Sequence, residues 1–269
     1  ARVAGGLEAE PIRIEGGTFT IEGNGAWLVH PNDDALRQSR LALNLSGKNI
    51  AAVLSALGYE PVIEGESLTV GGELTWLGGP DEGFLERADG NITMRMDEGS
   101  LLAVEPGSGR LLGVLSLAAL PRRLSFDFSD VFDDGLGFDT IQGDFTIDDG
   151  NAYTCNLGME GSVADMGVVG RTGLGARDYD QLAVVRPHVS NLLAVGGVVV
   201  GGPAAGAAML LFSQIFRKPL STLGESYYRI KGSWDDPSVE QIQGNDLDAA
   251  PLRNCEAFLA DAITESLKP

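Results

Sequence analysis

Four short segments of the chain repeat one order of residues: glycine, a polar residue, an apolar residue, threonine and a second apolar residue. These segments are residues 17–23, 72–78, 90–96 and 143–149. Because apolar residues recur at every second position, each segment is predicted to be a β-strand with its apolar side chains on one face. Threonine suits the other face, since its β-branched side chain fits the pleated backbone. The chain is therefore predicted to be mainly β.

Seven further segments alternate in a similar way, at residues 39–46, 66–71, 124–129, 151–158, 163–171, 179–185 and 226–233. Glycine, aspartate and asparagine between the segments favour turns, so successive strands are expected to pair antiparallel. Their spacing is irregular, which argues against a propeller or a short-period solenoid. We expect one long, curved antiparallel β-sheet with an apolar face, accompanied by a few short helices.

Helices are predicted where the alternation stops, at residues 49–58, 109–120 and 203–217. Asn49 is the expected N-cap of the first helix and Gly58 its end, and Pro121 ends the second. Residues 1–240 are interpreted as one β-groove region. Residues 241–269 lack the strand pattern and are interpreted as a variable C-terminal tail, in which 254–266 could form a helix.

The third helix raises the question of a membrane span, because no charged residue occurs from Pro187 to Phe216. Four glycines precede Pro203, and proline favours the first turn of a helix over its middle. A helix that begins there and ends near Arg217 is roughly 20 Å long, whereas a bilayer has a hydrocarbon core of roughly 30 Å. The sequence therefore favours a helix that packs on the sheet, or dips into a membrane face, over a spanning helix.

The net charge of the chain restricts its possible partners, whereas its two cysteines do not determine the cellular compartment. The formal net charge is −19, which argues against nucleic acid as a partner. Cys155 and Cys255 either form one bridge in an oxidising compartment or remain unpaired. The chain begins Ala-Arg-Val, without an initiator methionine or a signal-peptide pattern. We interpret it as a fragment whose export signal or membrane anchor lies upstream.

Motifs of catalysis and metal binding are absent from the sequence. His30 and His188 are the two histidines, and neither has the spacing of a metal site. No nucleophile elbow or phosphate-binding loop occurs. The acidic run from Asp127 to Asp139 lacks the ligand spacing of a calcium loop, and Arg122 and Arg123 are expected to pair with these aspartates. The sequence thus predicts a protein that is not an enzyme and has no metal or cofactor.

The predicted apolar face has two interpretations, an ordinary core or a binding groove. Three short helices are too small to cover a dozen or so strands, and an uncovered apolar face on a soluble protein marks a binding surface. A concave apolar sheet can shield acyl chains from water, which is worth roughly 0.8 kcal/mol per buried CH₂ group. The groove residues predicted from the alternation are Phe19, Ile21, Leu74, Trp76, Ile92, Met94, Met96, Phe126, Phe128, Phe145 and Ile147.

Several longer motifs resemble the C-terminal region of YhdP-type AsmA-like proteins. The motifs are GRLLGVLSLAALPRRLSFDFSDVF (109–132), GFDTIQGDFTIDDG (137–150), ARDYDQLAVVRPHVS (176–190), GGPAAGAAMLLFSQIFRKPL (201–220) and YYRIKGSWDDPSVE (227–240), in the family's order. NIAAVLSALGYE (49–60) and GGELTWLGGP (71–80) are also similar to the family. The resemblance covers most of the chain and is weakest over residues 1–35 and 241–269.

The resemblance implies a function that the spacing of residues does not show. Such proteins are anchored in the inner membrane, cross the periplasm as a twisted β-sheet with a hydrophobic groove, and are implicated in moving phospholipid between the inner and outer membranes. The expected partners are phospholipid, the inner leaflet of the outer membrane and envelope proteins. A non-enzymatic scaffold for outer-membrane assembly is the alternative. The helix from Pro203 is then expected to cap the groove or contact the membrane through Leu210, Leu211, Phe212, Ile215 and Phe216.

Overall fold

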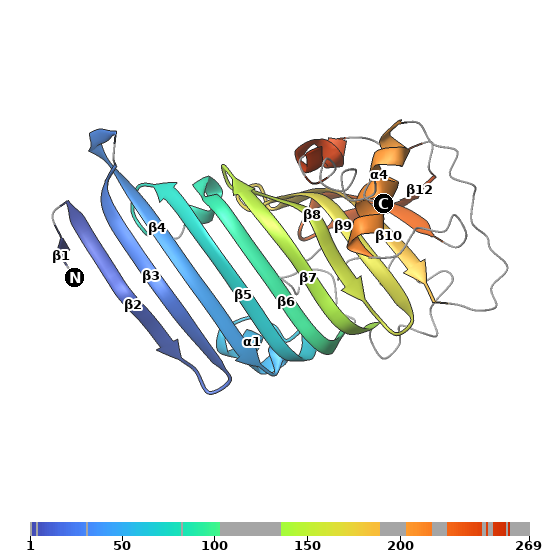
Figure 1. Cartoon of the computed structure of the whole chain (residues 1–269), viewed down its shortest axis with the longest axis horizontal. Helices are drawn as coiled ribbons and strands as arrows, with labels where there is room; N and C mark the ends of the chain where they lie inside the picture. Colours follow the sequence, from blue (N-terminus) through green and yellow to red (C-terminus); the bar gives the residue numbers. More distant parts are fainter. Residues whose placement is uncertain are drawn as a thin grey trace, which may run out of the picture.

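In the part of the chain that it describes, the computed structural model has one sheet of twelve strands, paired antiparallel in the order of the sequence (Figure 1). The structure describes residues 2–102, 136–188, 203–216, 225–243, 246 and 250–258, except positions 4, 31, 82 and 257. The strands are β1 (Arg2–Val3), β2 (Gly6–Glu15), β3 (Phe19–His30), β4 (Asp33–Lys48), β5 (Ile63–Leu77), β6 (Asp89–Leu101), β7 (Leu136–Asp148), β8 (Asn151–Glu160), β9 (Ala164–Gly173), β10 (Asp178–Pro187), β11 (Ser226–Ser233) and β12 (Pro237–Ile242). The predicted fold class, a mainly β chain with a long antiparallel sheet, is confirmed.

Several strands are longer than the sequence pattern predicted, because glycines that were interpreted as turns lie inside strands. Residues 66–71 and 72–78 were predicted as separate strands, but both fall in or at the end of β5. Gly72 pairs with Ile92 of β6, and a Cβ atom on Gly72 would lie 3.0 Å from the carbonyl oxygen of Asn91. Close approach between backbones, not a turn, explains glycine at this position.

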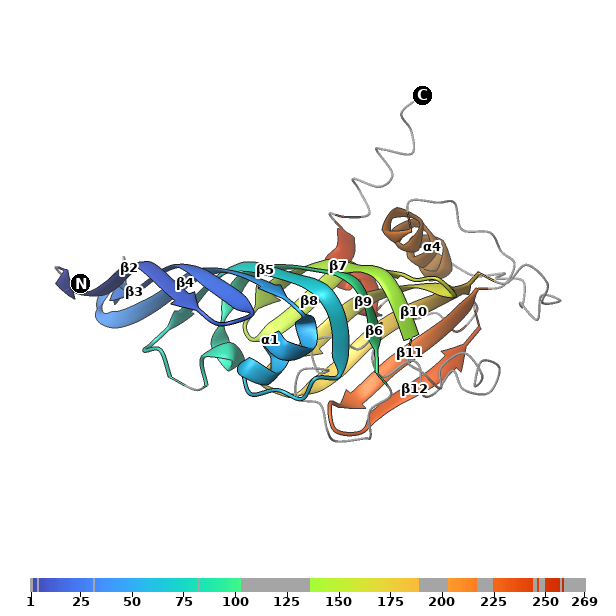
Figure 2. The same cartoon turned by 90° about the horizontal axis from the view of Figure 1, so that it is seen from below.

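The sheet is curved and carries a separate hydrophobic core on each face. Figure 2 shows α1 (Ile50–Ala56) on one side, toward which β11 and β12 turn, and α4 (Pro203–Ile215) on the other. Alternate residues contribute to the two cores, since Val168 packs on the α1 side and Val169 on the α4 side. We call the α1 side the inner face and the α4 side the outer face.

Helix α1 lies in the connection between β4 and β5, within the predicted range 49–58. Ile50 and Val53 are fully buried on the inner face. Asn49 is the N-cap: its backbone has a positive φ of 62°, and its side-chain oxygen accepts a hydrogen bond of 3.1 Å from the amide of Ala52. A residue that both adopts this conformation and caps the helix is required here.

Replacing Asn49 with alanine is expected to lower the free energy of unfolding by about 1–2 kcal/mol, because both the cap and the tolerance of positive φ are lost. Asn49→Gly retains the backbone conformation and is expected to cost less than Asn49→Ala. Urea denaturation of both variants checks this expectation, which fails if glycine proves at least as destabilising as alanine.

Helix α4 packs on the outer face of the sheet, at the opposite side from α1. Leu211 and Phe212 are fully buried there, and the ring of Phe212 lies 6.2 Å from that of Tyr227. The predicted helix 109–120 and strand 124–129 lie outside the described residues. Among the helices that the structure does describe, none has both the length and the apolar composition needed to cross a bilayer.

The predicted tail contributes to the fold in two places. Strand β12 continues to Ile242, and the short 3-10 helix η4 (Ala250–Cys255) packs on the outer face against β9. Cys255 of η4 forms a disulfide with Cys155 of β8, 100 residues earlier in the sequence. The sequence left open whether the two cysteines pair, and in the structure they form a disulfide bridge.

Candidate functional site

The inner face of β3 to β7 forms an apolar hollow of about 380 Å³, which we call the central groove. Register places its side chains in rows across the strands, as with Leu45 opposite Ile21 and Val70 opposite Met94. Apart from two glycines and Tyr59, every lining residue in the described part of the chain has an aliphatic, thioether or phenyl side chain. The lining residues are Ile21, Leu41, Leu43, Leu45, Leu54, Leu57, Tyr59, Ile63, Leu68, Val70, Gly71, Gly72, Leu74, Ile92, Met94, Met96 and Phe145.

A second hollow of about 680 Å³ lies on the same face, toward the other end of the strands. Leu41 lines both hollows, so they meet at this side chain. Trp27, Trp76 and Phe84 supply much of the apolar wall of the second hollow. The two hollows together extend the apolar surface from the α1 end of the strands to the turn after β5.

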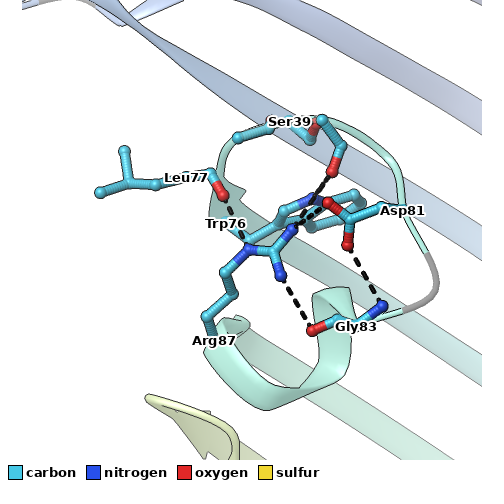
Figure 3. Close-up of polar contacts among 8 residues, drawn as sticks. Ser39, Trp76, Leu77, Asp81, Gly83 and Arg87 are labelled. Carbon is cyan, nitrogen blue, oxygen red and sulfur yellow. Dashed lines mark hydrogen bonds and ion pairs between the residues drawn. The ribbon is translucent and has the colours of Figure 1, made fainter.

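The wall at the second hollow is fixed by the loop between β5 and β6 (Figure 3). The rings of Trp76 and Phe84 lie 4.7 Å apart, and the indole nitrogen of Trp76 donates to the carbonyl of Gly79 at 2.8 Å. Ser39 of β4 donates to the carbonyl of Gly78 at 2.9 Å. These contacts hold Phe84, at the start of the 3-10 helix η1 (Phe84–Arg87), against the indole ring.

Arg87 organises the same loop through its guanidinium group (Figure 3). It donates to the carbonyls of Leu77 at 2.9 Å and Gly83 at 3.0 Å, and it pairs with Asp81 at 2.6 Å. The hydrogen bond from Arg87 lowers the pKa of Asp81 below its ordinary value. The carboxylate of Asp81 is thus paired at the edge of the apolar surface.

The opposite wall is helix α1 with the turn that follows it. Leu54, Leu57 and Tyr59 all line the central groove from this side. Leu54 is buried, whereas Leu57 is 39% and Tyr59 42% exposed. The groove is therefore bounded at both ends of its strands, by α1 on one side and by the β5–β6 loop on the other.

Along the sheet, the inner face changes from exposed to buried. Leu7 and Ile14 of β2 face the same side as Trp27 and Ile21, their partners in β3, and they are 46% and 50% exposed. The inner-face residues Leu157, Val168 and Ala183 of β8, β9 and β10 are fully buried. The apolar surface is therefore open near β2 and closed near β8–β10.

The structure brings six of the predicted groove residues together. The central groove contains Ile21, Leu74, Ile92, Met94, Met96 and Phe145, and Trp76 lines the second hollow. Phe19 and Ile147 pack in the same inner-face core. Phe126 and Phe128 lie outside the described residues. That any of these side chains contacts lipid stays a prediction.

Sequence reasoning missed three groups of lining residues. Ile63, Leu68 and Val70 lie in β5, and the last two fall in the predicted strand 66–71. Leu41, Leu43 and Leu45 lie in a segment that was predicted as a strand, so its alternation was a usable signal. Leu54, Leu57 and Tyr59 come from α1 and its following turn, and no period-two pattern marks them. Their position depends on how the helix crosses the inner face, which only the folded chain reveals.

The predicted membrane-proximal residues lie in and just after α4, away from the groove. Leu211, Phe212 and Phe216 are buried against the outer face, Ile215 is half-buried, and Leu210 is 38% exposed. The guanidinium of Arg186 lies 4.5 Å from the centre of the Phe216 ring. Because α4 is on the outer face, it does not cover the central groove, and a groove-capping role for this helix is wrong. Contact of α4 with a membrane stays a prediction.

Polar chemistry is sparse at the site. His188 pairs with Asp165 at 2.9 Å, and the ring of His30 accepts a 3.3 Å hydrogen bond from the amide of Asn32; neither residue lines the two hollows. Within the described part of the chain, no three His, Cys, Asp or Glu side chains converge as metal ligands would.

An open antiparallel sheet with an apolar groove on one face defines the class as a β-groove protein. The chain belongs to the YhdP protein family, whose model matches residues 2–239. It is 30% identical over 230 residues to the "Intermembrane phospholipid transporter YhdP" of Escherichia coli (strain K12). That match covers 85% of this chain and 18% of the relative, so the chain spans less than a fifth of the relative's length. No solved structure matches the chain significantly.

Proposed function

We propose that this chain is the part of an envelope protein that carries phospholipid in an apolar β-groove, between the inner and outer membranes. The central groove carries the proposal, because its wall of aliphatic, thioether and aromatic side chains suits acyl chains. Each CH₂ group that leaves water for such a wall contributes about 0.8 kcal/mol. A headgroup would remain in solvent at the mouth of the groove, where the lining residues Leu57 and Tyr59 are exposed.

The relative and the disulfide support the location and the cargo. The Escherichia coli relative is named a phospholipid transporter, and this chain shares its family. The bond between Cys155 and Cys255 suits an oxidising compartment such as the periplasm. We propose that the full-length protein is anchored in the inner membrane, acts without catalysis and supports the outer-membrane barrier.

Native mass spectrometry of the purified chain, followed by lipid extraction, tests the proposal. We expect phospholipid to co-purify, or to bind after incubation with phosphatidylethanolamine in detergent micelles. The alternative is a scaffold for outer-membrane assembly, which is favoured by the double core at β8–β10. A chain that neither retains nor takes up phospholipid under these conditions would contradict the carrier and leave the scaffold.

A further inference from the structure

A lipid that occupies the central groove needs a route into it, and the packing of the sheet limits where that route can lie. On the β8–β10 side, inner-face residues such as Leu157 and Ala183 are fully buried. A packed core of this kind has no room for an acyl chain unless side chains are displaced. The route must therefore lie at β2, where the apolar surface is open, or across one of the two walls.

The two walls of the groove differ in which apolar side chains they expose to solvent. Nine large apolar side chains are exposed among the described residues, and of these Leu57 and Tyr59 line the central groove. We call these two residues the α1 lip. At the other wall, Leu85 is 39% exposed but lines neither the central groove nor the second hollow. Leu77 is 50% exposed, but it follows the inner-face residue Trp76 in β5 and therefore lies on the outer face. A continuous apolar surface therefore leads from solvent into the central groove on the α1 side, whereas on the β2 side the exposed Leu7 lines only the second hollow.

Backbone hydrogen bonds hold the α1 lip in place, so it is not a frayed helix end. The amides of Leu57 and Tyr59 donate to the carbonyls of Val53 at 3.0 Å and Leu54 at 2.9 Å. Gly58 between them has a φ of 85°, a conformation that glycine adopts without strain. The turn thus presents both side chains at the groove mouth.

The chemistry of the lip suits a bilayer surface. A tyrosine combines an apolar ring with a polar tip and is enriched where hydrocarbon meets water. Glu60 follows directly and is exposed, which favours zwitterionic over anionic headgroups at this site.

We propose that the α1 lip is the portal through which an acyl chain of a zwitterionic phospholipid passes between a bilayer and the central groove. The portal rests on the proposed carrier function and names the site of exchange. A portal acts on rates: if the bound state is unchanged, loading and unloading slow by the same factor while the amount bound at equilibrium stays constant.

Transfer of a fluorescent phosphatidylcholine from phosphatidylcholine vesicles to the 269-residue chain, followed by stopped flow, tests the portal. Leu57→Asp and Tyr59→Asp are expected to slow loading about tenfold, because hydrocarbon must then pass a carboxylate. Leu85→Asp is the matched control, since Leu85 has the same exposure as Leu57 and lies at the other wall; it is expected to load like the parent chain. Leu57 and Tyr59 also line the groove, so equilibrium affinities are measured in parallel: loss of a wall contact alone speeds unloading, whereas loss of the portal slows loading.

A steric block applied after folding separates the portal from any effect on helix stability. The Tyr59→Cys variant is expected to take up phospholipid at the normal rate before modification and slowly after a bulky maleimide has reacted with the cysteine. The loading rate of Leu85→Cys is expected to be the same before and after modification. Equal rates before and after modification at position 59 would overturn the portal alone. If the parent chain takes up no phospholipid at all, the carrier function and the portal are both overturned.

Discussion

Replacing Met94 with aspartate is expected to weaken phospholipid binding by more than about a hundredfold while the chain stays folded. Met94 is half-buried in the wall of the central groove. In the empty groove a carboxylate there remains hydrated, but a bound acyl chain would remove that water. Leaving an unpaired charge against hydrocarbon costs several kcal/mol, and each 1.4 kcal/mol is a factor of ten in affinity.

Thr93→Asp is the matched control, because Thr93 is the next residue of β6 and is exposed on the opposite face. Titration with a fluorescent phospholipid measures both affinities, and circular dichroism verifies the fold. Equal losses of affinity in the two variants would mean that added charge, not the groove wall, decides binding. Trp76 and Phe145 are poorer probes, since they are 4% and 3% exposed and an aspartate there would unfold the site.

Removing the disulfide is expected to lower the free energy of unfolding by about 3 kcal/mol. Cys155 and Cys255 are 100 residues apart, and a cross-link that closes so long a loop restricts the unfolded chain strongly. The bridge also fixes η4, whose Leu252 joins Val169 and Leu182 in the outer-face core. Residue 255 lies beyond the residues matched by the family model, so the bridge ties an additional segment to the shared fold.

The double variant Cys155→Ala/Cys255→Ala measures the effect in guanidinium chloride, and alanine avoids burying a hydroxyl at position 255, which is 1% exposed. A reducing agent is expected to destabilise the parent chain by a similar amount and to leave the double variant unchanged. Affinity for phospholipid is expected to survive, since the bridge lies on the outer face. If reduction changes lipid affinity but not stability, the assignment of the bridge to the outer-face core is wrong.

Alternation of residues was sufficient to predict most strands of the sheet and the identity of its inner face, but it did not predict β1, β2 or β12. The rows that contain Ile21, Leu74 and Ile92 follow from a period of two, and the meander follows from the turns between strands. Strand lengths were not predictable in this way, because Gly23 and Gly72 look like turn residues although they lie within β3 and β5. Glycine serves both purposes, and only contacts with the neighbouring strand distinguish them.

The parts of the site that escaped prediction depend on contacts across the fold. Leu57 and Tyr59 reach the groove because α1 crosses the inner face between β4 and β5, and no local pattern encodes that crossing. The pairing of Cys155 with Cys255 depends likewise on how η4 lies over β8. For α4 the sequence favoured packing on the sheet or contact with a membrane face, and the structure shows that its buried side chains pack on the outer face, where the sheet is also apolar.

The order of the strands makes the length of the groove adjustable in discrete steps. Each strand from β1 to β12 pairs with its sequence neighbours alone, so a hairpin can be added or lost without rethreading the chain. Neighbouring strands lie about 4.8 Å apart, and one inserted hairpin therefore lengthens the sheet by about 10 Å. A groove built in this way can be lengthened or shortened by duplicating or deleting hairpins, while its cross-section stays the same.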